Sequence, residues 1–150
     1  MPIKRNEFLQ AISREHHHGL LLCWKIRAGI KKRIEPSRMK MYVDWFYQDH
    51  LLPHFEIEEK FIFPILSKED GLIKRALLEH RRLRRLFEST KEILRNLSLI
   101  EEELDNHIRF EERVLFNEIQ AIATQDQLTQ IQFHHKETKF KDNLSDPFWV

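Results

Sequence analysis

The chain has 150 residues, of which 33% are charged, and its formal net charge is +1 at pH 7. This near-neutral balance argues against a nucleic-acid-binding protein, because such proteins usually bind through a clustered basic surface. No apolar run approaches the roughly 20 residues that a membrane helix needs, and the first residues lack the apolar stretch of a secretory signal. We therefore expect neither a membrane nor a nucleic acid as a partner.

The cysteine and histidine contents are both informative. The single cysteine, Cys23, cannot form an internal disulfide, which favours a reducing cytoplasm as the location. Nine histidines are many for this length, and they cluster in the sequence. Their positions relative to the predicted helices are therefore the feature to explain.

The first predicted helix covers about residues 5–33, where apolar residues recur every three or four positions. His16 falls in the middle of this apolar stripe, and His17 lies about 100° further round the helix. His16 is the better candidate for an inward-facing histidine. His17 is the second, because a small rotation of the helix would bring it inward.

A second helix is predicted over about residues 38–66, with Ser37 as its N-cap. Pro53 and Pro64 fall inside this helix, and each removes one backbone hydrogen bond. We therefore expect a kink near His54.

The remaining helices are predicted from apolar spacing and from capping patterns. A third helix covers about residues 72–94. Ser98 begins the form Ser-x-x-Glu of a capping box, which predicts a fourth helix that extends to about residue 122. Thr124 begins a similar form, and a short fifth helix is expected through about residue 139, before an irregular tail. The aromatic residues of the tail are expected to pack back onto the helices.

Four long amphipathic helices with short connections predict an all-α fold, an up-down-up-down four-helix bundle. The bundle is expected over about residues 5–122, and the short helix and tail over 123–150. The length fits a single domain, 1–150, with a real core.

Each long helix carries an inward-facing histidine, and two of them carry an inward-facing glutamate one turn later. These candidate metal ligands are His16 (or His17), His54, Glu58, His80, His107 and Glu111. A buried carboxylate is usually protonated, paired or bound to a metal, and no Lys or Arg is in phase to pair with these two. Nitrogen and oxygen ligands without a thiolate suit iron, manganese or zinc.

The number of candidate ligands favours two metal ions over one. Six ligands are too many for one tetrahedral zinc, but they fit two metals bridged by Glu58 and Glu111. A single histidine on an apolar face is more often a hydrogen-bonded core residue, yet four in-phase histidines with two in-phase glutamates favour a metal site. Glu59 and Glu112 point about 100° away from the bridging pair. They are expected at the surface or holding a histidine N–H.

Four motifs together resemble the hemerythrin-like, or HHE cation-binding, family. They are Glu15-His16-His17, His54-Phe55-x-x-Glu58-Glu59 with Phe63-Pro64, Glu79-His80-x-x-Leu83, and His107-x-x-x-Glu111-Glu112. The resemblance covers about residues 5–122. It implies a four-helix bundle with a non-heme di-iron centre, bridged by two carboxylates and an oxo or hydroxo group. By position, it implies the same candidate ligands that the helix phases give, with iron as the metal and zinc or manganese as possible substitutes.

The sequence also departs from the pattern of oxygen-carrying hemerythrins. Those proteins have a histidine one turn before the third-helix histidine, where this chain has Ala76. They have an aspartate five residues after the fourth-helix histidine, where this chain has Glu111 at four and Glu112 at five. A missing imidazole predicts a more open or weaker iron site. This argues against reversible oxygen carriage and favours the sensing, nitric-oxide-response or iron-handling members of the family.

The leading functional hypothesis is a cytoplasmic di-iron protein that binds or responds to a small diatomic ligand, oxygen or nitric oxide. One alternative is an iron-donating protein that repairs iron–sulfur clusters under nitrosative stress. Another alternative is a regulatory module that senses iron or oxygen. The simplest alternative is a structural helix bundle that binds no metal. The sequence does not decide whether the protein is an enzyme, and it predicts no particular protein partner.

Overall fold

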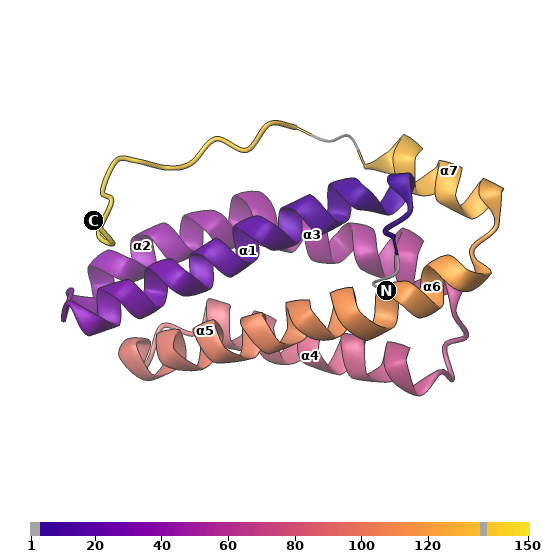
Figure 1. Cartoon of the computed structure of the whole chain (residues 1–150). Coiled ribbons are helices and arrows are strands. Elements are labelled where there is room, and N and C mark those ends of the chain that lie inside the picture. Colours follow the sequence, from indigo (N-terminus) through magenta and orange to yellow (C-terminus); the bar gives the residue numbers. More distant parts are fainter. Residues whose placement is uncertain (1–3, 136–137) are drawn as a thin grey trace.

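The described part of the computed structural model, residues 4–135 and 138–150, contains helices and no strand, which confirms the all-α prediction. Figure 1 shows the long helices lying alongside one another, with the tail crossing over one side of them. The α-helices are α1 (Glu7–Lys31), α2 (Pro36–Phe46), α3 (Leu52–Ile57), α4 (Gly71–Glu88), α5 (Ile93–Phe110), α6 (Phe116–Ile122) and α7 (Gln125–His134). The helical turns of other types are π-helical at Tyr47–Leu51, Glu58–Ile62 and Glu111–Leu115, and 3-10 at Phe63–Ile65. Within these described ranges, no helix combines the length and apolar character that a membrane crossing requires.

Helix α1 agrees with the first predicted helix to within two residues at each end. The side chain of Asn6 caps it by accepting a hydrogen bond from the Phe8 N–H, 2.9 Å away. Gly19 lies inside this helix, where a glycine normally reduces stability. A Cβ at Gly19 would lie only 2.7 Å from Cδ1 of Ile108 in α5, so this glycine allows the two helices to approach closely.

The second predicted helix begins earlier than expected, and Ser37 is not its N-cap. Helix α2 starts at Pro36, with Glu35 at the capping position and no side-chain cap bond. A proline suits the first turn of a helix, because its fixed φ is already helical and its missing N–H is not needed there. This preference explains why the helix begins before Ser37.

Two π-helical turns, one on each side of His54, interrupt the second predicted helix near the prolines at which we expect a kink. The first ends where the Leu52 N–H bonds to the Tyr47 carbonyl, immediately before Pro53. The second ends in the same way before Pro64, where the 3-10 turn begins. A proline has no N–H to continue the α-helical ladder, and in both places the wider turn comes directly before the proline.

The boundaries of the third and fourth predicted helices were partly wrong. Helix α4 ends at Glu88 rather than near residue 94. Helix α5 begins at Ile93, after Glu92 in a left-handed conformation with φ of 49°, so Ser98 lies inside the helix and does not cap it. The apolar stripe of α5 already starts before Ser98 with the buried Leu97, and burial of such a stripe contributes more to a helix than a local cap does.

The short fifth helix has the capping box that the sequence predicts. In α7, the Thr124 side chain accepts from the Gln127 N–H, and the Gln127 side chain accepts from the Thr124 N–H. The helix ends at His134 instead of about residue 139. Residues 136 and 137 of the predicted helix lie outside the described residues, and the chain is irregular from residue 138 onward.

The irregular tail packs onto the helices, as the sequence predicts for its aromatic residues. Phe148 is buried in the apolar cluster formed with α1 and α2. Asp142 accepts hydrogen bonds from the Lys25 ammonium at 2.6 Å and from the Tyr42 hydroxyl at 2.5 Å. The Lys25 Nζ also lies 4.1 Å from the centre of the Trp149 ring. These contacts fix residues 142–149 against α1 and α2.

Replacing Asp142 by Asn should destabilise the protein in a pH-dependent manner. Burial raises the pKa of Asp142, but the hydrogen bonds from Lys25 and Tyr42 outweigh it and the pKa is lowered. A carboxyl whose pKa is lowered by folding stabilises the protein above its unfolded pKa of about 3.9, and this contribution is lost as the pH falls through the folded pKa. We therefore expect Asp142→Asn to reduce the unfolding free energy by about 2 kcal/mol at pH 7, and by much less near pH 3.

Urea unfolding of the two proteins at both pH values measures this difference. Asp146→Asn is the matched control, because Asp146 pairs with Arg38 on the exposed surface of the same tail. A difference between wild type and Asp142→Asn that stays constant from pH 7 to pH 3 would contradict the prediction.

Candidate metal centre

The structure brings six of the seven predicted site residues together in the centre of the helices. One group of possible metal ligands is His16, His54, Glu58 and Glu111, and a second group is Glu58, His80, His107 and Glu111. Within each group, one ligand atom from every residue lies within 4.8 Å of the others. We call these six residues the ligand cluster. His17 is exposed and lies outside it, so the geometry favours His16 as the contribution of α1.

The helical spacing predicted from the sequence places the ligand pairs on one face. Nε2 of His54 lies 3.3 Å from Oε1 of Glu58, and Nε2 of His107 lies 3.4 Å from Oε2 of Glu111. Each glutamate is also the first residue of a π-helical turn. Isolated π-helical turns occur frequently at functional sites, so this location agrees with a functional role for Glu58 and Glu111.

The two shared glutamates are fully buried, with 0% of each exposed. The ion pairs recorded for them within the described residues are all with histidines of the ligand cluster, at 2.9–3.8 Å. A buried carboxylate is costly unless a positive charge or hydrogen-bond donors compensate it. The cluster therefore requires positive charge, either as protons on the imidazoles or as metal ions.

Four further glutamates, which we call the outer glutamates, hold the other side of each imidazole. The bonds join Glu15 to His54 at 2.7 Å, Glu59 to His80 at 2.6 Å, Glu79 to His107 at 2.7 Å, and Glu112 to His16 at 2.9 Å, in each case through Nδ1. Each bond connects one helical segment to the next, and the fourth returns to α1, so the bonds form a closed ring around the cluster. In a neutral imidazole that carries its proton on Nδ1, this N–H donates to the carboxylate and the Nε2 lone pair faces the interior.

The atoms inside this ring are unsatisfied. Nε2 of all four histidines and both carboxylate oxygens of Glu58 and Glu111 are buried; they lie near one another as ion pairs but form no well-aligned hydrogen bond among the described residues. Buried polar atoms nearly always have partners in native proteins. Eight such atoms that face one small volume fit metal ions as their missing partners, and carboxylate–histidine pairs are the usual support of metal-bound imidazoles.

The family model of the hemerythrin HHE cation binding domain matches residues 7–119. The chain belongs to the hemerythrin HHE cation-binding family. No curated protein and no solved structure matches the chain in the other two comparisons. The matched range contains all six residues of the ligand cluster, so the family and the geometry point to the same chemistry, the binding of metal cations.

The electrostatics of the hemerythrin domain favour positive charge at the cluster. Burial lowers the pKa of His54 and His107, but the nearby glutamates outweigh it and raise the pKa to about 9 and about 10. Burial raises the pKa of Glu58, but the surrounding histidines outweigh it and the pKa falls well below its usual range. Metal cations would supply positive charge at the same place.

The outer glutamates also lie beside basic side chains near the surface of the hemerythrin domain. Arg84 contacts Glu59 at 2.9 Å, and Arg75 contacts Glu79 at 2.9 Å. Arg5 lies 4.0 Å from Glu112, and His135 lies 3.2 Å from Glu15. The ring therefore lies between the ligand cluster and a set of basic side chains, and its negative charge is shared by both.

Sequence reasoning assigned a possible role to two of the outer glutamates and missed the other two. Glu59 and Glu112 were expected at the surface or bonded to a histidine N–H, and they form such bonds. Glu15 and Glu79 had no predicted role. The available signal was their position, since each directly precedes a histidine of the ligand cluster, about 100° round the helix.

Access to the ligand cluster differs between its two ends. The His80 imidazole stacks on the Phe55 ring, with centroids 3.9 Å apart, and also contacts Phe63. At the other end, His16 and His54 border a cavity of about 250 Å³. A molecule that enters from this cavity therefore meets the His16 and His54 end first.

Replacing Glu79 by Gln should weaken metal binding, because the neutral amide supports the His107 imidazole less well. Loss of such a partner typically lowers metal affinity by about tenfold or more. The affinity for iron(II) can be measured by competition with a chromogenic chelator under anaerobic conditions. Glu103→Gln is the control, because Glu103 pairs with the exposed Arg82 nearby. Equal affinities of the two variants would show that the Glu79 bond does not support the metal site.

Proposed function

We propose that the ligand cluster binds two metal ions, and that these are iron. The observation that carries this proposal is that the two four-residue groups share both Glu58 and Glu111. In this arrangement both ions would share Glu58 and Glu111, His16 and His54 would hold one ion, and His80 and His107 would hold the other. Zinc and manganese are the alternatives that this donor set also suits.

Four protein ligands for each ion favour iron over zinc in a functional site. Structural zinc is complete with four ligands, whereas iron commonly accepts more and would retain positions for a further ligand. When bound, iron would supply a coordination position for dioxygen or nitric oxide. The protein itself orients the imidazoles through the outer glutamates and shields one end of the cluster with Phe55 and Phe63. We propose that the protein binds or responds to such a diatomic ligand.

The surroundings of Ala76 argue against simple oxygen carriage. Ala76 is fully buried in α4, one turn before His80, and it belongs to an apolar cluster. A methyl group therefore stands where oxygen carriers have a third imidazole, and each proposed metal keeps only two histidines. Weaker retention of iron follows, which supports iron donation to damaged iron–sulfur clusters as the alternative function. A module that senses iron or oxygen would use the same metal site, and would differ from an iron donor only in the protein partner on which it acts.

Three inferences on organisation accompany this proposal. The short connections between α1 and α2, between the 3-10 turn and α4, and between α4 and α5 support the up-down-up-down order of the bundle. Both apolar clusters border the ligand cluster along the same helices, which supports a single domain.

Cys23 is buried and unpaired, which supports a reducing compartment such as the cytoplasm.

Metal analysis of the purified protein tests the proposal. We expect about two irons per chain, one for each ligand group. Glu58→Ala and Glu111→Ala should lose iron and unfold at a lower temperature than the loaded wild type, because metal binding contributes to folding stability. Glu118→Ala is the control, since Glu118 is exposed on α6 and lies outside the cluster. Full iron in both cluster variants would refute the bridging roles, and stoichiometric zinc in place of iron would refute the iron assignment.

Absorbance of the reduced, iron-loaded protein tests the diatomic ligand. We expect a change on addition of nitric oxide or oxygen, because the proposed irons retain positions for a further ligand. The iron-free Glu58→Ala protein should show no change and serves as the control. A change that reverses when oxygen is removed would support carriage despite Ala76, and irreversible oxidation would support sensing or reaction. No response to either gas would contradict a diatomic ligand.

A further inference from the structure

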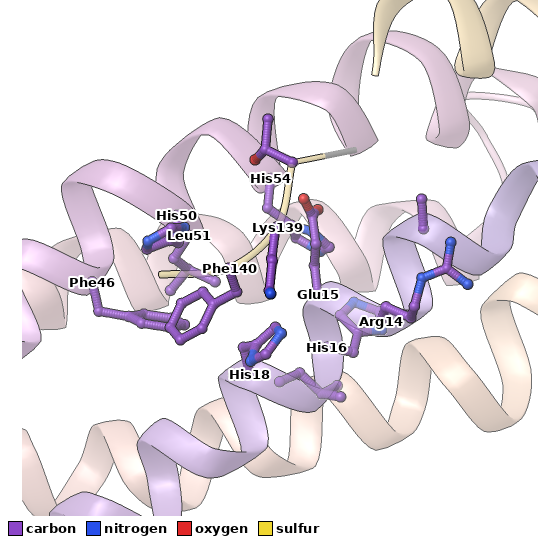
Figure 2. A pocket seen from close by; sticks show the side chains of 14 residues that line it. Arg14, Glu15, His16, His18, Phe46, His50, Leu51, His54, Lys139 and Phe140 are labelled. Carbon is purple, nitrogen blue, oxygen red and sulfur yellow. The ribbon is translucent and has the colours of Figure 1, made fainter. Parts of the chain in front are cut away.

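The cavity beside His16 and His54 is larger than a diatomic ligand requires. Its volume is about 250 Å³, whereas a water molecule occupies about 30 Å³ in the liquid and an apolar cavity of about 150 Å³ is enough to bind benzene. The cavity lies between α1, residues 46–54 of the second long segment, and tail residues 138–140 (Figure 2). It therefore has room for a small organic molecule.

Most of the cavity wall is apolar or aromatic. Phe46, Leu51 and Ile108 line it from the helices, and Phe140 lines it from the tail. The His18 ring stacks on Phe140 at 4.0 Å between centroids, and the His50 ring lies 4.7 Å from the same ring. Flat side chains on several sides suit a flat, apolar body.

The charged groups of the lining favour an anion. Figure 2 shows the Lys139 ammonium directed into the cavity from its tail side. Glu15 is the one carboxylate among the described lining residues; it is already hydrogen-bonded to His54 at 2.7 Å and lies 3.2 Å from Nε2 of His135. An apolar body with one negative group matches this combination of wall and charge.

We propose that this cavity binds a small organic monocarboxylate with an apolar, preferably aromatic, body. The carboxylate lies at the mouth beside Lys139, and the body lies against Phe46 and Phe140. This proposal goes beyond the binding of a diatomic ligand, and it does not require a metal in the ligand cluster. The inner wall is nevertheless formed by His16 and His54, so the bound molecule lies next to one end of the cluster.

The tail is a structural part of this site. Residues 138–140 form its outer wall, and the bonds of Asp142 to Lys25 and Tyr42 hold the chain two residues further on. The ring of Trp45 lies 5.0 Å from His50 and 6.3 Å from Phe140, immediately behind the wall. The fluorescence of Trp45 can therefore report occupation of the cavity.

Benzoate is a suitable probe, with benzyl alcohol as a neutral molecule of similar size. Titration calorimetry on the full-length, metal-loaded protein should show that benzoate binds more tightly than benzyl alcohol. Lys139→Gln should weaken benzoate binding by about threefold, the range of an exposed ion pair, and leave benzyl alcohol unchanged. Lys141→Gln, on the same tail but outside the lining, should change neither. Benzoate should alter tryptophan emission in the wild type but not in Trp45→Phe.

Three results would overturn the proposal. These are no binding of benzoate, equal effects of Lys139→Gln and Lys141→Gln, and loss of benzoate binding on metal removal from protein that circular dichroism shows to be folded. The last result would mean that the carboxylate binds the metal directly. Benzoate binding that depends on Lys139 in a chain without iron would instead support the cavity and count only against the proposed di-iron function.

Discussion

The burial of two carboxylates at the centre of the helices is the constraint on which the structure depends. Glu58 and Glu111 are removed from water, and a buried charge without compensation would prevent folding. Each long helical segment contributes to the compensation with one histidine that faces the pair. The apolar clusters lie on either side, since Ile12 of α1 belongs to one cluster and Leu22 to the other, with His16 between them.

The compensation has two layers with different dependence on metal. The outer glutamates find hydrogen-bond partners among the protein's own side chains, whereas the inner atoms of the ligand cluster do not, within the described residues. The outer layer can therefore hold the imidazoles in position before a metal arrives, which reduces the reorganisation that binding requires. The inner layer depends on protons or metal for its charge balance, so folding and metal binding are coupled there. The cavity borders this inner layer at only one end, which makes the two proposed metals unequal in their surroundings although their ligands are alike.

Helical periodicity was sufficient to predict the all-α fold and to identify the residues that meet at the centre, because burial of one face dominates the energetics of each helix. Local capping patterns were less reliable. Thr124 caps α7 as predicted, but Ser37 and Ser98 do not cap helices, since Pro36 and the buried stripe of α5 set those boundaries. The choice between His16 and His17 depends on the rotation of α1, which is fixed by tertiary contacts such as that of Gly19 with Ile108. The cavity could not be predicted at all, because it is formed by tail residues that are distant in sequence from the helices they cover.

The ring of outer glutamates also has a consequence for the alignment of the helices. In α1 and α4 an outer glutamate directly precedes a histidine of the cluster, and in the other two segments an outer glutamate directly follows a glutamate of the cluster. A shift of one residue along any helix rotates its side chains by about 100°, which would bring an outer residue to an inner position or an inner residue to an outer one. The misaligned segment would lose a residue of the ligand cluster and the support of a neighbouring imidazole at the same time. The pattern thus discriminates against slippage of a helix by one residue. An apolar interface of interchangeable leucines and isoleucines would tolerate such slippage far better.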